Sequence, residues 1–376
     1  MKVVLYTHSL VSDWNHGNAH FQRGLLTELA ARGHEVLALE PHDGWSRANL
    51  KLELGDDVDA EFETQFPGLP VQTYDAAFDH EAALADADLV IVHEWSDPSL
   101  VAEIGRLRRC GGAFTLLFHD THHRAVSASD AMAGLMLADY DGVLAFGESL
   151  AERYRSMGWG RRVFTWHEAA DIRRFRPLPA ADKQGDLVWI GNWGDEERTR
   201  ELATYLIEPA RVLGLSGTVH GVRYPREALE HLRRCRLDYA GWLPNVQVPG
   251  AMARHRLTVH GPRRPYVEAL PGIPTIRVFE ALACGIPLVC APWDDVEGLF
   301  RPGQDFLVAR DGEHMTQRLV DVLHEPELAA SLARNGLQRI LARYTCAHRV
   351  DELLLIVQAL ETSIPLGVLA AAAAAE

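Results

Sequence analysis

The chain has 376 residues and a formal net charge of −15 at pH 7. This length exceeds that of one ordinary core and fits two domains of average size. The acidic balance argues against non-specific binding to nucleic acid or to an anionic membrane, because such binding requires a basic face that releases counterions.

The cysteines and the two ends of the chain favour a reduced, cytoplasmic protein. The five cysteines are odd in number and never spaced as C-x-x-C, so we expect neither a disulfide framework nor a zinc site. The N-terminal "MKVVLYTHSLV" predicts a first strand rather than a signal peptide. The apolar stretch 353–375 is broken by Gln358, Glu361 and Pro365, which favours a docked helix and a disordered tail over a membrane span. Peripheral membrane contact stays open.

Apolar runs of strand length alternate with helical patterns along the chain. In the first half we predict strands at 2–8, 35–40, 88–93, 114–119, 142–147 and 162–167. In the second half we predict strands at 186–192, 217–222, 237–243, 257–262, 286–292 and 305–311. This alternation is typical of α/β domains with parallel sheets covered on both faces, so we expect two such sheets in tandem.

The segment 168–186 contains prolines and glycine and has no apolar period, so we predict a linker there. The expected domains are therefore 1–170 and 171–350. The final helical pattern is longer than the second sheet needs, so we expect a terminal helix at 351–366 that packs back on the first domain. A disordered tail is expected at 367–376.

Ligands of open parallel sheets bind beyond the carboxyl ends of the strands, so the residues that follow each strand are the first candidates for function. After the first strand, Gly17 and Asn18 precede a predicted helix that ends at Gly33, and this turn suits a phosphate or sugar contact. Glu40 lies near the spacing of a ribose-binding acid. The turn lacks the G-x-G-x-x-G pattern, however, which disfavours NAD chemistry.

Two further strands end in "VHEWSD" and "FHDTHHR", which place several polar side chains at one sheet edge. These residues are His93, Glu94, His119, Asp120, His122 and His123. They could cap loops or contact a substrate. A metal site is the less favoured alternative, because the pattern shows no third fixed ligand.

In the second half, "WIGNWGDEERTRE" follows a strand and enters a helix, which places Arg198 and Arg200 near a helix start that suits anions. An arginine there could neutralise a diphosphate. On local charge alone, the favoured alternative is an ion pair with one of the neighbouring acids, which are Asp195, Glu196, Glu197 and Glu201.

The segment "ALPGIPTIRVFEALACGIPLV", residues 269–289, predicts a turn followed by a helix that Gly285 and Pro287 end. Thr275 is the expected N-cap. Backbone amides of residues 273–277 would then favour an anionic ligand. Glu280, one turn along, could accept hydrogen bonds from ribose hydroxyls or form a surface pair with Arg277. The residues alone favour neither.

The order "SDWNHGNAHFQRGLLTELAARGHEV", "FHDTHH", "WIGNWGDEER", "RVFEALACGIPLVCAPW" and "EGLFRPGQDFLV" resembles GT-B glycosyltransferases of the family-four retaining type, especially the CgeB-like branch. The resemblance covers essentially the whole chain. It implies two Rossmann-like, doubly wound domains facing across a cleft. It also implies retaining transfer from a nucleoside-diphosphate sugar to an acceptor held mostly by the N-terminal domain, with no metal or other cofactor. The acceptor could be a glycan, a lipid-linked sugar, a protein or a small molecule, and no nucleic-acid partner is expected.

The resemblance assigns roles residue by residue. It places Gly17 at the donor phosphate, His119 at the transferred sugar, Arg198 at the diphosphate and Glu280 at the ribose. The nucleobase would rest on Trp242, Leu243 and Pro244, while the turn residues Gly272, Ile273, Pro274, Thr275, Ile276 and Arg277 would meet the donor. Asn18, His93, Glu94 and Asp120 complete the acceptor or sugar side, with His119, Arg198 and Glu280 expected to carry catalysis.

The chain departs from the family pattern in two places. Asn192 stands where the family keeps a second cation, for which Arg263 or Arg264 could compensate. Gly272 stands where the family has a carboxylate for the donor sugar, with Glu268 the nearest upstream acid and Glu297 matching the acidic position of the following loop.

The departure at residue 272 puts sugar recognition in doubt more than diphosphate binding. It keeps open a non-catalytic nucleotide-sugar binding or scaffold protein. A GT-B nucleotide-sugar epimerase is less favoured.

Overall fold

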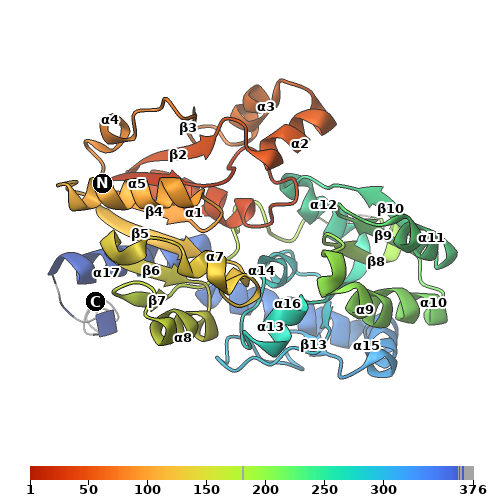
Figure 1. The fold of residues 1–376 in the computed structure, drawn as a ribbon. Coiled ribbons are helices and arrows are strands. Elements are labelled where there is room, and N and C mark those ends of the chain that lie inside the picture. Colours follow the sequence, from red (N-terminus) through yellow and green to blue (C-terminus); the bar gives the residue numbers. More distant parts are fainter. Residues whose placement is uncertain (180–181, 363, 365, 368–376) are drawn as a thin grey trace. The chain divides into compact units, whose positions relative to one another are not determined.

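The computed structural model describes residues 1–179, 182–362, 364 and 366–367. The chain divides into two compact units (Figure 1). The N-terminal unit consists of Met1–Glu168 together with the segment from Cys346 onward, and the C-terminal unit is Ala169–Thr345. Apart from Gly367, the predicted tail lies outside the described residues, as do residues 180–181 of the predicted linker.

The N-terminal unit is built on a parallel sheet in which the described residues form seven strands, in the order β3-β2-β1-β4-β5-β6-β7. These are β1 Lys2–Tyr6, β2 Glu35–Pro41, β3 Val71–Tyr74, β4 Leu89–His93, β5 Thr115–Asp120, β6 Gly142–Ala145 and β7 Val163–Thr165. The six predicted strands are confirmed. β3 escaped prediction because the short edge strand "VQTY" has no buried apolar run.

The strand order of this sheet reverses between β1 and β4, so a crevice for ligands is expected beyond their carboxyl ends. The helices are α1 Ala19–Ala31, α2 Trp45–Leu54, α3 Val58–Gln65, α4 His80–Leu84, α5 Pro98–Arg109, α6 Arg124–Ser127, α7 Ser129–Ala133, α8 Glu148–Met157 and α17 Cys346–Thr362. The terminal α17 packs against α1 and β5 (Figure 1). Trp166 fastens it by donating from Nε1 to the carbonyl of Arg349 at 3.0 Å.

The C-terminal unit has a parallel sheet of six strands among its described residues, in the order β10-β9-β8-β11-β12-β13. These are β8 Gly185–Ile190, β9 Gly217–His220, β10 Leu237–Gly241, β11 His255–His260, β12 Leu288–Cys290 and β13 Leu307–Val308. All six predicted strands of this half are confirmed. β8 begins inside the predicted linker, at Gly185.

The helices of the C-terminal unit pack on both faces of its sheet and bury two apolar clusters. They are α9 Thr199–Leu202, α10 Glu208–Leu213, α11 Arg226–Arg234, α12 Val248–Ala253, α13 Arg264–Glu268, α14 Ile276–Ala283, α15 Gly312–His324 and α16 Pro326–Arg343. α14 packs against α16, β11 and β12, so its first turn is held by the core. Throughout the described part of the chain, no helix combines the length and apolarity that crossing a membrane requires.

Candidate functional site

The turn that leads into α14 is shaped by Gly272. This residue has a φ of 88°, a left-handed conformation that side chains other than glycine rarely adopt. A Cβ at this position would lie 2.6 Å from Cγ2 of Val296, so a side chain here would require the exposed Val296 to shift. The carboxylate that the resemblance expects here would therefore need both a strained backbone and a displaced neighbour. Instead, Oε1 of Glu297 lies 3.6 Å from where that Cβ would be.

The rest of this turn is held by side chains of the core. Nε1 of Trp293 donates to the carbonyl of Ile273 at 3.2 Å, and Ile273, Pro274 and Ile276 are buried. The turn therefore presents its backbone rather than its side chains to a ligand. N–H groups in the first turn of an α-helix have no acceptor within the helix, which suits them to an anion.

Thr275 occupies the predicted N-cap position, but its side chain does not cap the helix. Its hydroxyl instead pairs with Nε2 of His260 at 3.0 Å, while Nδ1 of His260 lies 3.2 Å from Sγ of Cys290. Burial, together with the positive charges of Arg198 and Arg277, lowers the pKa of His260 to about 3. The ring is therefore neutral at pH 7, and both cations act on it from nearby.

Glu280 lies one turn into α14, and its side chain is completely buried. Arg277 donates a hydrogen bond to its carboxylate. Of the two alternatives that the residues left open, the structure shows the pair with Arg277, but inside the unit rather than on its surface, because the helix face that carries Glu280 is buried. A buried, charge-assisted pair of this kind holds its geometry better than an exposed one.

Arg198 follows β8 and is bound by backbone carbonyls. Nη1 donates to the carbonyl of Gly261 at 3.2 Å, Nη2 donates to that of Asn192, and the guanidinium lies 5.4 Å from the ring centroid of Trp189. Its buried Nε finds no hydrogen-bond partner among the residues that the structure describes. Burial, together with the nearby charge of Arg263, lowers the pKa of Arg198 to about 9.

The ion pair favoured for Arg198 on local charge is not found among the described residues. Glu197 instead pairs with Arg263 at 2.5 Å, and Glu201 pairs with Arg264 at 3.2 Å. The sequence neighbours of Arg198 are thus drawn to the two arginines proposed as substitutes for the second cation. Those arginines are consequently engaged, and Arg198 forms no ion pair among the described residues.

Other candidates line the same strand ends of the C-terminal sheet. The side-chain oxygen of Asn192 accepts from the N–H of Val222 at 2.9 Å, which ties the loop after β8 to the one after β9. Trp242, Leu243 and Pro244 follow β10 and are half-buried. Since parallel strands end at one edge, these segments and the loop after β11 share that edge with Arg198.

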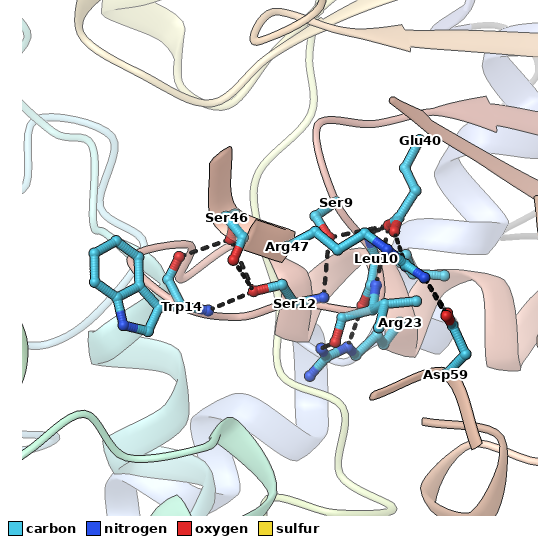
Figure 2. A network of polar contacts seen from close by, with 10 residues as sticks. Ser9, Leu10, Ser12, Trp14, Arg23, Glu40, Ser46, Arg47 and Asp59 are labelled. Carbon is cyan, nitrogen blue, oxygen red and sulfur yellow. Dashed lines mark hydrogen bonds and ion pairs between the residues drawn. The ribbon is translucent and has the colours of Figure 1, made fainter. Parts of the chain in front are cut away.

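In the N-terminal unit, Glu40 pins the loop that follows β1 (Figure 2). Its buried carboxylate accepts from the hydroxyl of Ser9 at 3.0 Å and from the N–H groups of Leu10 and Val11 at 2.6 and 3.2 Å. Arg47 completes the set with an ion pair at 2.5 Å. Glu40 therefore holds the loop, a role its spacing from the first strand did not suggest.

The candidates Asn18, His93 and Glu94 meet around Thr121, a residue that the sequence reading did not single out. Nε2 of His93 lies 3.1 Å from the hydroxyl of Thr121 and 2.9 Å from Oε2 of Glu94, and Asn18 donates to the same hydroxyl. Burial raises the pKa of Glu94 to about 8 and lowers that of His93 to about 3. At pH 7 this cluster therefore carries little charge. Gly17 precedes Asn18 in the turn before α1.

His119 and Asp120 end β5, as predicted. The ring of His119 packs edge-on against Trp166 at 5.0 Å between centroids, and its buried Nε2 has no hydrogen-bond partner among the described residues. Asp120 accepts from the hydroxyl of Tyr154 at 2.7 Å and from the N–H of His122 at 2.9 Å. Burial raises the pKa of Asp120 to about 7. In the described parts of the chain, no group of three or more His, Cys, Asp or Glu side chains is placed to hold a metal ion.

The sequence reading missed a group of aromatic rings beside this edge. His8 lies two residues after β1, and its ring centroid lies 4.4 Å from that of His16 and 4.7 Å from that of Trp45. The rule that points to residues after each strand passed over His8, because the predicted strand 2–8 contained it. It could not find Trp45, which is brought in by α2, more than thirty residues along the chain.

Comparisons with known proteins place this geometry in a known fold. A family profile described as "Glycosyl transferase-like" matches residues 198–355, which is less than half of the chain. The structure of HepE from Anabaena in complex with UDP and glucose is 13% identical with a TM-score of 0.68, covering 96% of this chain and 100% of that one. Both have two parallel-sheet units. The fold is GT-B.

Two further GT-B structures share the fold with this chain at similarly low sequence identity. Sucrose-phosphate synthase from Thermosynechococcus elongatus is 14% identical with a TM-score of 0.66, covering 97% of this chain and 100% of that one. T4 phage BGT in complex with UDP and Mn²⁺ is 12% identical with a TM-score of 0.62, covering 95% and 99%. A search of curated proteins found no match. The GT-B fold is thus established, while the retaining type and the CgeB-like branch stay predictions.

Proposed function

We propose that the chain is a glycosyltransferase that moves a sugar from a nucleoside-diphosphate sugar to an acceptor, as a CgeB-like member of the family-four retaining type. The observation that carries the proposal is Arg198. A half-buried guanidinium with a buried Nε that binds only carbonyls, as this one does among the described residues, is costly unless an anion compensates it. A diphosphate would supply that charge.

The first turn of α14 supports the same proposal. Arg198 and Arg277 both act on His260, and His260 bonds Thr275 at the start of the helix. The cation and the N–H groups of residues 273–276 would together stabilise the charge that develops on the departing diphosphate. Such preorganised stabilisation is usually the largest single contribution to catalysis.

The remaining donor contacts follow from the same edge. The nucleobase would rest on Trp242, Leu243 and Pro244, and the ribose hydroxyls would bond Glu280. Because Arg277 already donates to Glu280, the ribose would share this carboxylate with the guanidinium. HepE has been determined with UDP and glucose, and T4 phage BGT with its UDP-glucose substrate, so UDP-glucose is the first donor to test.

Sugar recognition near residue 272 falls to Glu297 in this proposal. Its carboxylate lies beside the place where a side chain at residue 272 would begin. Glu297 would therefore bond the hydroxyls of the donor sugar in place of the carboxylate that Gly272 removes.

Transfer with retention requires no protein base in this scheme. The leaving diphosphate oxygen would help to remove the acceptor proton on the same face of the sugar, with His119 positioning that sugar. Gly17 at the donor phosphate and the absence of a metal requirement belong to the same proposal. Product NMR reports the anomeric configuration, and activity retained in EDTA would support metal independence.

The deciding experiment measures nucleotide binding and turnover together. UDP, GDP and TDP are titrated by calorimetry, and nucleoside diphosphate release is followed from the corresponding sugars with candidate acceptors. Arg198→Ala should weaken binding of the preferred nucleotide by about tenfold or more, because a charged hydrogen-bonding partner is lost. Arg200→Ala is the matched control, since Arg200 is exposed on the same segment and should change affinity less than about twofold.

Three outcomes would overturn parts of the proposal. Equal affinity of Arg198→Ala and wild type would remove the diphosphate assignment. Nucleotide binding without transfer to any acceptor would favour a scaffold protein. Interconversion of the donor sugar without an acceptor would favour an epimerase. Glu280→Ala, tested alongside, should weaken nucleoside diphosphates more than inorganic diphosphate, which has no ribose.

A further inference from the structure

Two tryptophans in the N-terminal unit remain substantially exposed beside a buried histidine. Trp45 and Trp95 are 43% and 40% exposed, whereas His8 is 6% exposed. The ring of His8 lies 4.7 Å from that of Trp45, tilted by 39°, and 6.5 Å from that of Trp95, edge-on. The two indoles therefore flank one imidazole just after β1. Large aromatic surfaces left exposed in this way are typical of binding sites.

The loop that carries this group is fixed in place (Figure 2). The hydroxyl of Ser46, next to Trp45, donates to the carbonyl of Trp14 at 2.7 Å and lies 2.9 Å from the hydroxyl of Ser12. The rings of Trp14 and Trp45 meet edge-on at 6.1 Å. A surface held before the ligand arrives loses less conformational entropy on binding.

Arg23 also holds the same loop (Figure 2). Its guanidinium donates to the carbonyls of Leu10 and Val11 at 2.8 Å and forms a buried ion pair with Asp13 at 2.7 Å. Together with Glu40, it satisfies backbone N–H and carbonyl groups of Leu10 and Val11. The loop therefore offers its aromatic rings rather than its backbone.

Several ring nitrogens of His8, His16 and Trp14 have no hydrogen-bond partner in the part of the chain that the structure describes. Nδ1 and Nε2 of His8, Nε2 of His16 and Nε1 of Trp14 are all buried without a hydrogen-bond partner among the described residues. Buried polar atoms are nearly always paired in folded proteins, so this cluster points to a ligand that supplies the partners. Burial lowers the pKa of His8 to about 3 and that of His16 well below its usual value.

Both imidazoles are therefore neutral at pH 7, and each neutral ring has one N–H donor and one acceptor nitrogen. A hydroxyl group has the same pair of capacities. An anionic ligand would gain no charge from these rings. Of the neighbouring cations, Arg23 acts on His16 but is paired with Asp13, and Arg124 lies over the ring of Trp95 at 4.7 Å and donates to the carbonyl of Glu94 at 2.8 Å.

We propose that Trp45, Trp95 and His8 form a binding platform for a neutral saccharide, which makes the acceptor of this enzyme a carbohydrate. The apolar C–H face of a pyranose packs on an indole, and its hydroxyls bond the ring nitrogens of His8. This inference rests on the proposed function, because it names the acceptor class of that reaction.

The test is saturation-transfer NMR on the full chain with glucose, galactose, mannose, N-acetylglucosamine, maltose and cellobiose, with glucuronate as an anionic probe. At least one neutral sugar should receive saturation at its ring C–H protons. Trp45→Ala and Trp95→Ala should each reduce that signal at least about fivefold, and the same sugar should serve as an acceptor. Trp45→Tyr, which keeps a flat ring, should retain part of the signal.

Trp159→Ala is the matched control, because Trp159 is a half-buried tryptophan of the same unit that packs on Tyr154 instead. It should leave the sugar signal unchanged. Circular dichroism and thermal melting establish that each variant is folded. If Trp45→Ala does not fold, Trp95→Ala and Trp45→Tyr decide the question.

Several outcomes would overturn the platform. They are saturation of no neutral sugar in the wild type, a signal that survives Trp45→Ala and Trp95→Ala, or binding of glucuronate alone. Tryptophan-dependent binding of phosphatidylcholine vesicles or of a DNA duplex in place of a sugar would assign the surface to another partner. UDP calorimetry on the same samples separates the two proposals. UDP binding without sugar binding would contradict only the saccharide platform. Sugar binding without binding of UDP, GDP or TDP would contradict only the assignment of the donor site.

Discussion

The two units place different polar chemistry at the corresponding edge of their sheets. In the C-terminal unit, Arg198 and the first turn of α14 gather positive charge and N–H groups. In the N-terminal unit, the corresponding edge holds neutral histidines and the protonated carboxyl group of Glu94. The first suits a diphosphate and the second suits hydroxyl groups. One kind of sheet edge can thus be tuned to two ligands by burial and by the residues that follow each strand.

The largest expected effect is the loss of stability on removing Glu40, which holds the loop after β1 in the N-terminal unit. Glu40→Ala leaves the buried Arg47 with only the exposed carboxylate of Asp59 and frees two backbone N–H groups, so the free energy of unfolding should fall by about 3–5 kcal/mol. Urea denaturation measures the loss. Asp59→Ala removes the exposed partner of the same arginine, whose side chain is 63% exposed, and should cost less than about 1 kcal/mol. Equal losses would mean that Glu40 does not hold the loop.

The next largest effect is the loss of stability expected on substituting Gly272, in the turn before α14 of the C-terminal unit. Gly272→Ala adds a left-handed backbone penalty of about 1–2 kcal/mol and a clash with Val296 that should add about 1–3 kcal/mol. Gly298→Ala is the matched control, because Gly298 has a φ of 65° with nothing within 4 Å of its Cβ position. Comparison of the two unfolding free energies isolates the clash. Similar losses would show that Val296 yields easily.

Substitution of Glu297 tests whether the C-terminal unit binds the donor sugar as well as the diphosphate. Glu297→Gln should lower kcat/KM for the sugar donor by about tenfold, the usual cost of a lost charged hydrogen bond, and leave UDP affinity nearly unchanged. Glu268→Gln, at an exposed residue upstream of the turn, should change neither quantity. A larger effect of Glu268→Gln would move sugar recognition to the loop before the turn.

The smallest effect is the pH dependence of the N-terminal edge. The pKa of Glu94 is raised to about 8 by burial, so the folded state binds more protons than the unfolded state between pH 4.5 and 8. Its contribution to stability therefore falls as pH rises through that window. Glu94→Gln should lose less stability than wild type between pH 6.5 and 8.5 in urea titrations, and the exposed Glu63→Gln should follow wild type. A steeper loss in Glu94→Gln would contradict the buried, protonated carboxyl.

The local features of the C-terminal unit were largely predictable. The turn at 269–275 and the helix after Thr275 depend on neighbours in the chain, so glycine, proline and helical spacing were enough. The Arg277–Glu280 pair was one of two alternatives that the spacing left open. The prediction failed for the cap of Thr275, because the competing partner His260 comes from β11. It failed for the ion pair of Arg198, because Arg263 and Arg264 arrive from a distant loop and take the acids.

The sequence by itself determined the α/β fold, both sheets and the strand ends at which function was sought, since hydrophobic periodicity and turn residues are local signals. Only the tertiary structure decided what those residues do. It showed that the left-handed backbone at residue 272 favours glycine, that Glu40 holds a loop, and that the ring of His8 lies near two tryptophans. These facts depend on side chains that meet across long stretches of chain and on burial that changes their charge, and neither is written in a local pattern.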